Sequence, residues 1–186
     1  MNNTALIIVD LQNDYFSSFE NAKYPLFKTE EALANALKIL NKFREKNMKI
    51  IHIRHESVGK NALFFQENTQ GAQIHSVLNP QKNEEQVLKH NINSFKSTDL
   101  KQILDTSNIE NVIILGAMSH ICIDAITRAA SDYGYNCSVI HDACASKAVE
   151  FNGIKVEATL VHASFMAALE FGYAKVKSTN EILEEI

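Results

Sequence analysis

The sequence is poor in the residues that mark disulfide-rich, zinc-ribbon or linker-rich proteins. It has three cysteines in 186 residues, two prolines and six scattered glycines. An odd number of cysteines without a C-x-x-C pair indicates neither a disulfide framework nor a zinc ribbon. Because no stretch rich in proline, glycine or serine divides the chain, we expect residues 1–186 to form one domain.

Long apolar runs and clusters of one charge are also missing. The first apolar run, residues 5–9, is too short for a signal peptide or a membrane span. Eighteen basic and twenty-two acidic residues leave a formal charge of −4, without a run of five or more like charges. We therefore expect a cytoplasmic protein whose main partner is neither a nucleic acid nor a membrane.

Short apolar segments alternate with helical patterns along the chain. Residues 5–10 are continuously apolar up to the final aspartate, which predicts a strand buried on both faces. The other elements expected are strands at 49–54, 87–89, 111–115, 137–141 and 174–176, helices at 29–46, 121–133 and 156–171, and a final helix capped by Ser178. This alternation predicts a three-layer α/β/α, doubly wound, Rossmann-like fold with a mostly parallel sheet.

Residues that directly follow the apolar runs are the first candidates for function. In open α/β sheets, ligands bind beyond the carboxyl ends of the strands. The candidates are Asp10, Arg54, His55, Lys89, His90, the loop 116–122 and Asp142. The long segment 56–86 has no clear period and is expected to form either a lid or an oligomer contact.

Cys122 lies in the first turn of the helix expected after the strand 111–115, with Ser119 as a candidate N-cap. Free N–H groups and the helix dipole at this place would lower the pKa of the thiol and make it a nucleophile. The plainer alternative is a small buried hydrophobe. Asp10 and Lys89 end strands at the same edge, where they are either a charged cluster around the thiol or ordinary polar strand ends.

Three separated blocks resemble the signatures of the isochorismatase-like cysteine hydrolases. They are LIIVDLQNDYF at 6–16, Lys89 with NSF at 93–95 and TDL at 98–100, and GAMSHICIDA at 116–125. The likeness continues through TRAA at 127–130 and HDACA at 141–145 to the helix around His162. It therefore extends over nearly the whole chain.

The resemblance implies the isochorismatase-like fold and a set of site residues. The implied catalytic triad is Asp10, Lys89 and Cys122, and the implied oxyanion hole is formed by the backbone N–H groups of Met118 and Cys122. A cis peptide bond is implied between Ala117 and Met118.

Two departures from relatives narrow the expected chemistry. Nicotinamidases of this superfamily hold a metal through an Asp-x-His element, whereas residues 53–57 read IRHES, so no metal and no other cofactor is expected. His52 and His55 would face opposite sides of a strand. Siderophore-type isochorismatases lack the nucleophilic cysteine, which makes vinyl-ether cleavage the lesser reading.

The resemblance is nearest to the metal-free amidases related to streptothricin hydrolase, judging from residues 71–75 and 150–153. It implies a small-molecule amide substrate, whose amide or lactam C–N bond is cleaved through a thioester. Phe16, His55 and Phe64 are the candidate pocket walls, although Phe64 could equally belong to the core or to an interface. His120 and His162 are either structural histidines or substrate contacts.

Alternatives from other classes remain at this point. The chain could be an isochorismatase-type hydrolase, a metal-dependent nicotinamidase, or a catalytically silent binding or assembly module on the same fold. A phosphoacceptor receiver domain would need an aspartate where this chain has Lys89. Apolar helix faces near Met166, Leu169 and Phe171, expected to be exposed, favour a homodimer or a larger homo-oligomer.

Overall fold

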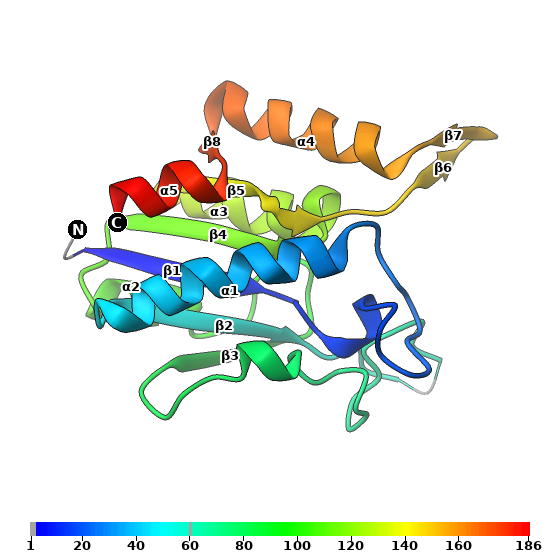
Figure 1. Ribbon diagram of the computed structural model, residues 1–186, viewed down its shortest axis with the longest axis horizontal. Helices are drawn as coiled ribbons and strands as arrows, with labels where there is room; N and C mark the ends of the chain where they lie inside the picture. Colours follow the sequence, from blue (N-terminus) through cyan, green and yellow to red (C-terminus); the bar gives the residue numbers. More distant parts are fainter. Residues whose placement is uncertain (1–2, 60) are drawn as a thin grey trace.

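The structure is a computed structural model that describes residues 3–59 and 61–186. A parallel sheet of six strands forms its centre (Figure 1). The six strands are β1 (Thr4–Val9), β2 (Lys49–His55), β3 (Glu85–Lys89), β4 (Asn111–Ala117), β5 (Asn136–Ala145) and β8 (Lys175–Lys177). Their order across the sheet is β3-β2-β1-β4-β5-β8, and all five neighbouring pairs run parallel.

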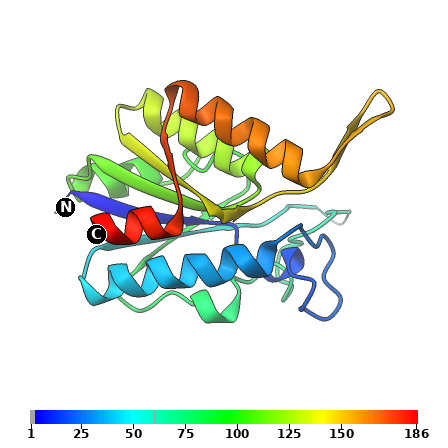
Figure 2. The same ribbon diagram turned by 45° about the horizontal axis from the view of Figure 1, so that its top comes forward.

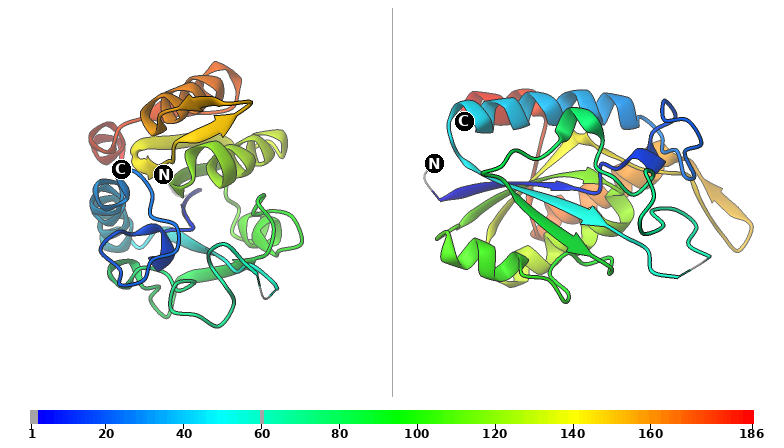
Figure 3. Two further views of the ribbon diagram at one scale, coloured as in Figure 1. Left: turned by 90° about the vertical axis from the view of Figure 1, so that its right-hand side faces the viewer. Right: turned by 90° about the horizontal axis from the view of Figure 1, so that it is seen from below.

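Helices cover both faces of this sheet. They are α1 (Thr29–Glu45), α2 (Leu100–Thr106), α3 (Asp124–Asp132), α4 (Ala158–Gly172) and α5 (Thr179–Glu185). The right-hand view of Figure 3 shows α1 and α5 on one face and α2 and α3 on the other, and α4 packs on α3. The predicted three-layer α/β/α class is therefore confirmed. None of the helices in the described ranges is long and apolar enough to cross a bilayer.

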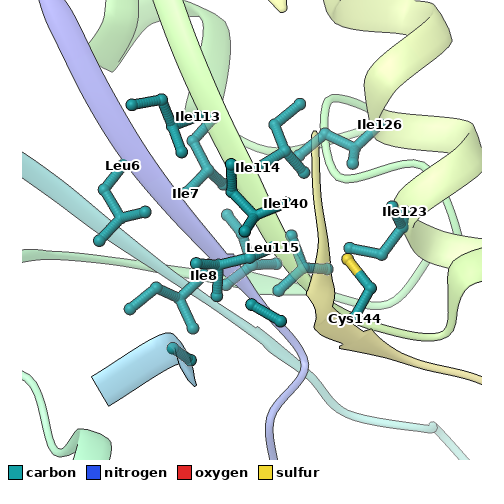
Figure 4. Packing of buried hydrophobic residues seen from close by; sticks show 14 of the residues in the cluster. Leu6, Ile7, Ile8, Ile113, Ile114, Leu115, Ile123, Ile126, Ile140 and Cys144 are labelled. Atoms are coloured by element: carbon teal, nitrogen blue, oxygen red, sulfur yellow. The ribbon is translucent and has the colours of Figure 1, made fainter. Parts of the chain in front are cut away.

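The core is built around β1, which is buried along its whole length, as its continuous apolar run predicts. Ile7 of β1 pairs in register with Ile114 of β4. Figure 4 shows how these side chains pack with Ile140, Ile123 and Ile126 between the sheet and α3. Full burial of such a side chain contributes about 1.5–3 kcal/mol, so the central strands contribute strongly to the stability of the fold.

Some secondary-structure elements could be predicted from local sequence signals, and others could not. α5 begins at the predicted cap, where Ser178 and Glu181 form a capping box. The sequence reading missed α2 and also the hairpin of β6 (Val149–Phe151) and β7 (Ile154–Val156). Strands of three residues are too short to show a period of two. Figure 2 shows this hairpin projecting from the body of the molecule.

The helix faces expected to be exposed near the end of α4 are mostly buried. Met166 and Leu169 are 6% and 0% exposed, whereas Phe171 is 95% exposed. The prediction for the first two residues was wrong because α4 packs on α3 and β8 instead of standing free. Other exposed apolar side chains lie on the β6–β7 hairpin, where Phe151 and Ile154 are 78% and 67% exposed, and at the start of α4, where Leu160 is 60% exposed.

Candidate active site

The two strand ends and the turn that carry the predicted triad meet at the carboxyl edge of the sheet. Asp10 directly follows β1, Lys89 ends β3, and Cys122 lies in the turn after β4. Asp10 has a left-handed backbone with φ 52°, a conformation that aspartate adopts more readily than most residues. The chain thus turns sharply after β1 and keeps the carboxylate at the edge of the sheet.

Lys89 joins the other two side chains. Its Nζ lies 2.8 Å from Asp10 Oδ2, and it donates hydrogen bonds to Cys122 Sγ at 3.0 Å and to the carbonyl of Ile92 at 3.0 Å. Asp10, Lys89 and Cys122 are 0%, 1% and 3% exposed. The structure therefore brings the three residues together in a buried, charged cluster.

The cluster holds its thiol in the protonated form at rest. Burial acts to lower the pKa of Lys89, but the charges of Asp10 and Cys122 outweigh it and the pKa is raised. Burial, and next the charge of Asp10, raise the pKa of Cys122 despite the nearby ammonium. The expected lowering by a helix N-terminus was wrong. Lys89 and Asp10 already neutralise each other, so a thiolate would add an uncompensated charge inside the protein.

The turn that carries Cys122 differs from the helix start that the sequence predicts. Ser119–Ile123 forms a π-helical turn preceded by Met118, and Ser119 is not the cap. Instead, Ser119 Oγ donates to the carbonyl of Ala145 at 3.1 Å and lies 2.8 Å from His162 Nδ1. His162 thus holds this turn in place, one of the two roles left open for it. His120 similarly contacts the hydroxyl of Ser146 at 2.9 Å.

The peptide bond between Ala117 and Met118 is cis. Within the described part of the chain, the N–H of Met118 has no hydrogen-bond acceptor. The Met118 carbonyl accepts from Ile121 at 3.0 Å and Ile123 at 3.2 Å and passes over Cys122 between them. The resemblance implies an oxyanion hole formed by the N–H groups of Met118 and Cys122, and neither of them donates to the Met118 carbonyl.

Gly116 allows β1 and β4 to approach closely beside the site. Its φ of 126° is unfavourable for other residues, and a Cβ there would collide with the carbonyl oxygen of Val9. Glycine is the residue that meets both requirements. The backbone conformation and the close approach of Val9 therefore explain why a glycine occupies this position of the third sequence block.

His55 is positioned by a buried glutamine. Gln12 Oε1 accepts the His55 N–H at 2.7 Å, while Gln12 Nε2 donates to the carbonyls of His55 at 2.8 Å and Ala72 at 2.7 Å. One donor atom each from His55, Asp10 and Cys122 lies within 4.8 Å of the others. Burial lowers the pKa of His55 and outweighs the charge of Asp10, which acts to raise it, so the ring is neutral.

The other predicted pocket residues lie behind an aromatic side chain that the sequence reading missed. Phe16 is fully buried and packs on the His75 ring, with 4.5 Å between centroids. Phe64 packs on Tyr24 at 4.6 Å and on Tyr15 at 5.3 Å. Tyr15 itself is buried, and burial, then the charges of Asp10 and Cys122, raise its pKa, so the phenol stays neutral.

Tyr15 could have been found from its place in the first block, five residues after Asp10. A short 3-10 turn, Asn13–Tyr15, brings the Tyr15 phenol close enough to the cluster to be affected by the charges of Asp10 and Cys122. The segment between β2 and β3 packs against this turn, since the carboxylate of Asp14 accepts the N–H of Phe65 at 2.7 Å. The expectation of a lid or an oligomer contact for this segment stays a prediction.

The two histidines of β2 point to different surroundings. His52 Nε2 lies 2.8 Å from Glu84 Oε2 and takes no part in the triad cluster. His55 alone joins Asp10 and Cys122 as a possible metal ligand among the described residues.

A cavity of about 630 Å³ lies at the opposite, amino-terminal ends of the strands, beside Cys137 and Tyr173. Ligand sites of such sheets are not expected at this end.

The sequence model of the isochorismatase domain family matches residues 4–159 of this chain. The chain belongs to the isochorismatase family. A solved structure from Oleispira antarctica, assigned provisionally to the isochorismatase hydrolases, is 51% identical and has a TM-score of 0.96 over 98% of this chain and 97% of that one. The uncharacterized isochorismatase family protein YddQ of Bacillus subtilis is 41% identical over 97% of this chain and 99% of its own length.

A more distant relative has a named activity. Streptothricin hydrolase of Streptomyces noursei is 27% identical over 76% of this chain and 49% of its own length. Together these relatives make the chain an isochorismatase-family hydrolase.

Proposed function

We propose that this family member hydrolyses a C–N bond of a small amide or lactam through a thioester on Cys122. The supporting observation is the contact of Lys89 Nζ with both Asp10 and Cys122, at 2.8 and 3.0 Å, beside the free N–H of Met118. A nucleophile, a proton acceptor and an oxyanion donor are the three parts that acyl transfer requires.

The first half of the proposed reaction forms the thioester. The Cys122 proton moves to Asp10 while Sγ forms a bond to the carbonyl carbon, and the carbonyl oxygen becomes an oxyanion. The N–H groups of Met118 and Cys122 stabilise this oxyanion. When the intermediate collapses, the C–N bond breaks and the proton on Asp10 passes to the departing nitrogen.

The second half releases the acid. Water attacks the thioester carbon, and Asp10 accepts one of its protons. The C–S bond then breaks, the carboxylic acid leaves, and the proton returns to the sulfur. The thiol and the carboxylate are thus restored.

Lys89 acts in this scheme as the fixed cation of the cluster. Its raised pKa keeps it charged throughout, and its contacts hold the carboxylate and the sulfur in place. The ammonium offsets the negative charge that develops on sulfur and oxygen during attack. The proton therefore leaves Cys122 when substrate arrives and not before.

The proposed pocket wall consists of His55 and Tyr15 next to the cluster, with Phe64 and Phe65 packed on Tyr15. A neutral imidazole and a neutral phenol can each donate or accept one hydrogen bond from a polar substrate group. Phe64 is the partly exposed ring of this group and supplies apolar surface, as is usual in small-molecule sites, while Tyr15 and Phe65 are buried behind it. Hydrogen-bonding groups next to an aromatic surface suit a planar, polar amide.

Replacing the nucleophile gives the first test. Cys122→Ala should lower the turnover of an accepted amide by at least about 10³-fold, because covalent chemistry is lost. The assay would follow ammonia or amine release from nicotinamide, ureido compounds and cyclic lactams. Intact-protein mass spectrometry of the wild type during turnover should show an acyl adduct that Cys122→Ala lacks.

Cys137→Ala is the matched control, since this buried thiol lies on β5 away from the cluster. It should retain wild-type turnover. Amide turnover that survives in Cys122→Ala would contradict the thioester intermediate. Binding without turnover across the amide panel would favour a silent binding module.

A further inference from the structure

Three metal-binding atoms of different types suggest a second chemical use of the same cluster. One atom each from Asp10, His55 and Cys122 lies within 4.8 Å of the other two. Carboxylate oxygen, imidazole nitrogen and thiolate sulfur are the ligands that Zn²⁺ prefers, commonly three from the protein and one water. In such a site the ligand atoms lie roughly 3.5 Å apart, so small side-chain rotations would complete it.

Two of these three side chains have a metal-binding atom that makes no hydrogen bond to a described residue. The Asp10 carboxylate is 0% exposed, and its Oδ1 accepts no hydrogen bond from the described residues. The ring of His55 likewise makes no hydrogen bond to a residue that the structure describes, while its backbone is fixed by Gln12. A buried carboxylate oxygen without a donor is costly unless a cation or a ligand satisfies it.

We propose that Asp10, His55 and Cys122 form a binding site for a thiophilic divalent cation such as Zn²⁺, which blocks the proposed nucleophile. The metal is not a cofactor in this proposal, and it does not use the Asp-x-His element of nicotinamidases. Binding replaces the thiol proton: Cys122–SH and Zn²⁺ give a Cys122–S–Zn bond and one released proton. His55 is the partly exposed member of the three, so the ion enters from its side.

The ammonium group of Lys89 opposes metal binding at this site. Its ammonium contacts both Asp10 and Cys122, so a bound cation has to displace it and bear its repulsion. We infer that Lys89 keeps the cluster free of metal at low concentrations of free zinc. Removing this charge should therefore strengthen metal binding, although it would abolish turnover in the proposed mechanism. This opposite response separates the two functions of the residue.

The test measures binding directly and needs no substrate. Zn²⁺ is titrated into the full chain against a chromophoric chelator, and Co²⁺ is used as a second probe for its thiolate charge-transfer absorption. We expect one ion per chain, one proton released, and at least a tenfold loss of affinity in Cys122→Ser and in His55→Ala. Lys89→Met should bind at least tenfold more tightly than the wild type.

Cys137→Ser and His141→Ala are matched controls outside the cluster and should bind as the wild type does. Affinity that is unchanged in both Cys122→Ser and His55→Ala would overturn the site, as would the absence of binding in wild type and Lys89→Met at about 100 µM zinc. If Lys89→Met does not fold, the two ligand variants decide the question. Because none of these readouts is turnover, failure of the proposed amidase reaction would leave this result standing.

Discussion

At the scale of single residues, three cysteines of similar burial have different neighbours. Cys122, Cys137 and Cys144 are 3%, 6% and 7% exposed. Burial raises the pKa of both Cys137 and Cys144 to about 12. Of the three, Cys122 alone forms a hydrogen bond with a charged side chain in the described structure. Exposure does not distinguish the candidate nucleophile from the other thiols, whereas its contact with Lys89 does.

Glu84 is a second buried charge, and it belongs to the stability of the fold. Its carboxylate contacts Arg44 Nε at 2.6 Å, His52 Nε2 at 2.8 Å and the N–H of Gln81 at 2.9 Å. Burial acts to raise the pKa of Glu84, but these partners outweigh it and lower the pKa to about 2. The sequence offered no sign of this network because its members are far apart along the chain.

The lowered pKa of Glu84 predicts a pH-dependent stability. A carboxyl group whose pKa is lower in the folded protein stabilises it above its unfolded pKa of about 4.5, and this contribution disappears as the pH falls to about 2. Glu84→Gln should therefore lower the free energy of unfolding by up to about 3 kcal/mol at pH 7 and by much less near pH 2. Urea unfolding at several pH values measures this difference.

Glu85→Gln is the control for this prediction, because the Glu85 side chain is 45% exposed in its pair with Lys49. Its loss should cost less than about 1 kcal/mol, with little dependence on pH. A difference between Glu84→Gln and wild type that stays constant from pH 7 to pH 2 would contradict the role given to the Glu84 carboxylate.

At the scale of elements, the segment between β2 and β3 is held by contacts with the 3-10 turn after β1. Asp14 accepts the N–H of Phe65 at 2.7 Å and of Lys23 at 3.2 Å, and its carboxylate lies directly against Gly71. This arrangement seats the Phe65 ring on Tyr15, with 4.4 Å between centroids. The wall of the proposed pocket therefore depends on one buried carboxylate.

Gly71→Ala should disturb this wall. A Cβ at position 71 would overlap the Asp14 carboxylate, which would have to move and loosen its bond to Phe65. Such overpacking costs about 1–3 kcal/mol, and thermal or urea unfolding would detect it. For the proposed amide substrate, we expect a rise in KM larger than the change in kcat, because Tyr15 and not the nucleophile loses support.

Gly172→Ala is the matched control, since a Cβ there meets no atom within 4 Å. It should leave stability within about 1 kcal/mol of the wild type, or raise it slightly. Equal changes in stability for the two substitutions would show that the contact between position 71 and Asp14 does not matter for stability.

At the scale of the whole molecule, the β6–β7 hairpin is the feature that the single chain leaves uncovered. Its Phe151 and Ile154 are 78% and 67% exposed, and Figure 2 shows it extending beyond the body. An isolated two-stranded hairpin is at best marginally stable in water. Exposed apolar patches often mark interaction sites, and we propose that a second copy of the chain covers this arm.

The expected homodimer should therefore depend on the hairpin. Phe151→Ser combined with Ile154→Ser should convert a dimer into a monomer in sedimentation experiments, because the apolar area that drives association is removed. Phe171→Ser, at the far end of α4, is the control and should leave the dimer intact. Wild-type protein that sediments as a monomer would contradict the prediction.

The sequence alone determined the α/β class, the central strands and the three blocks that indicate the family, because these depend on local periodicity and on short motifs. It also supplied Asp10, Lys89 and Cys122 as candidates. Tertiary structure decided what no local pattern contains: that Lys89 reaches across β2 to Asp10, that the thiol is buried enough to keep its proton, and that Tyr15 lies near the cluster. These features depend on distances and desolvation between residues far apart in the chain, which exist only after folding.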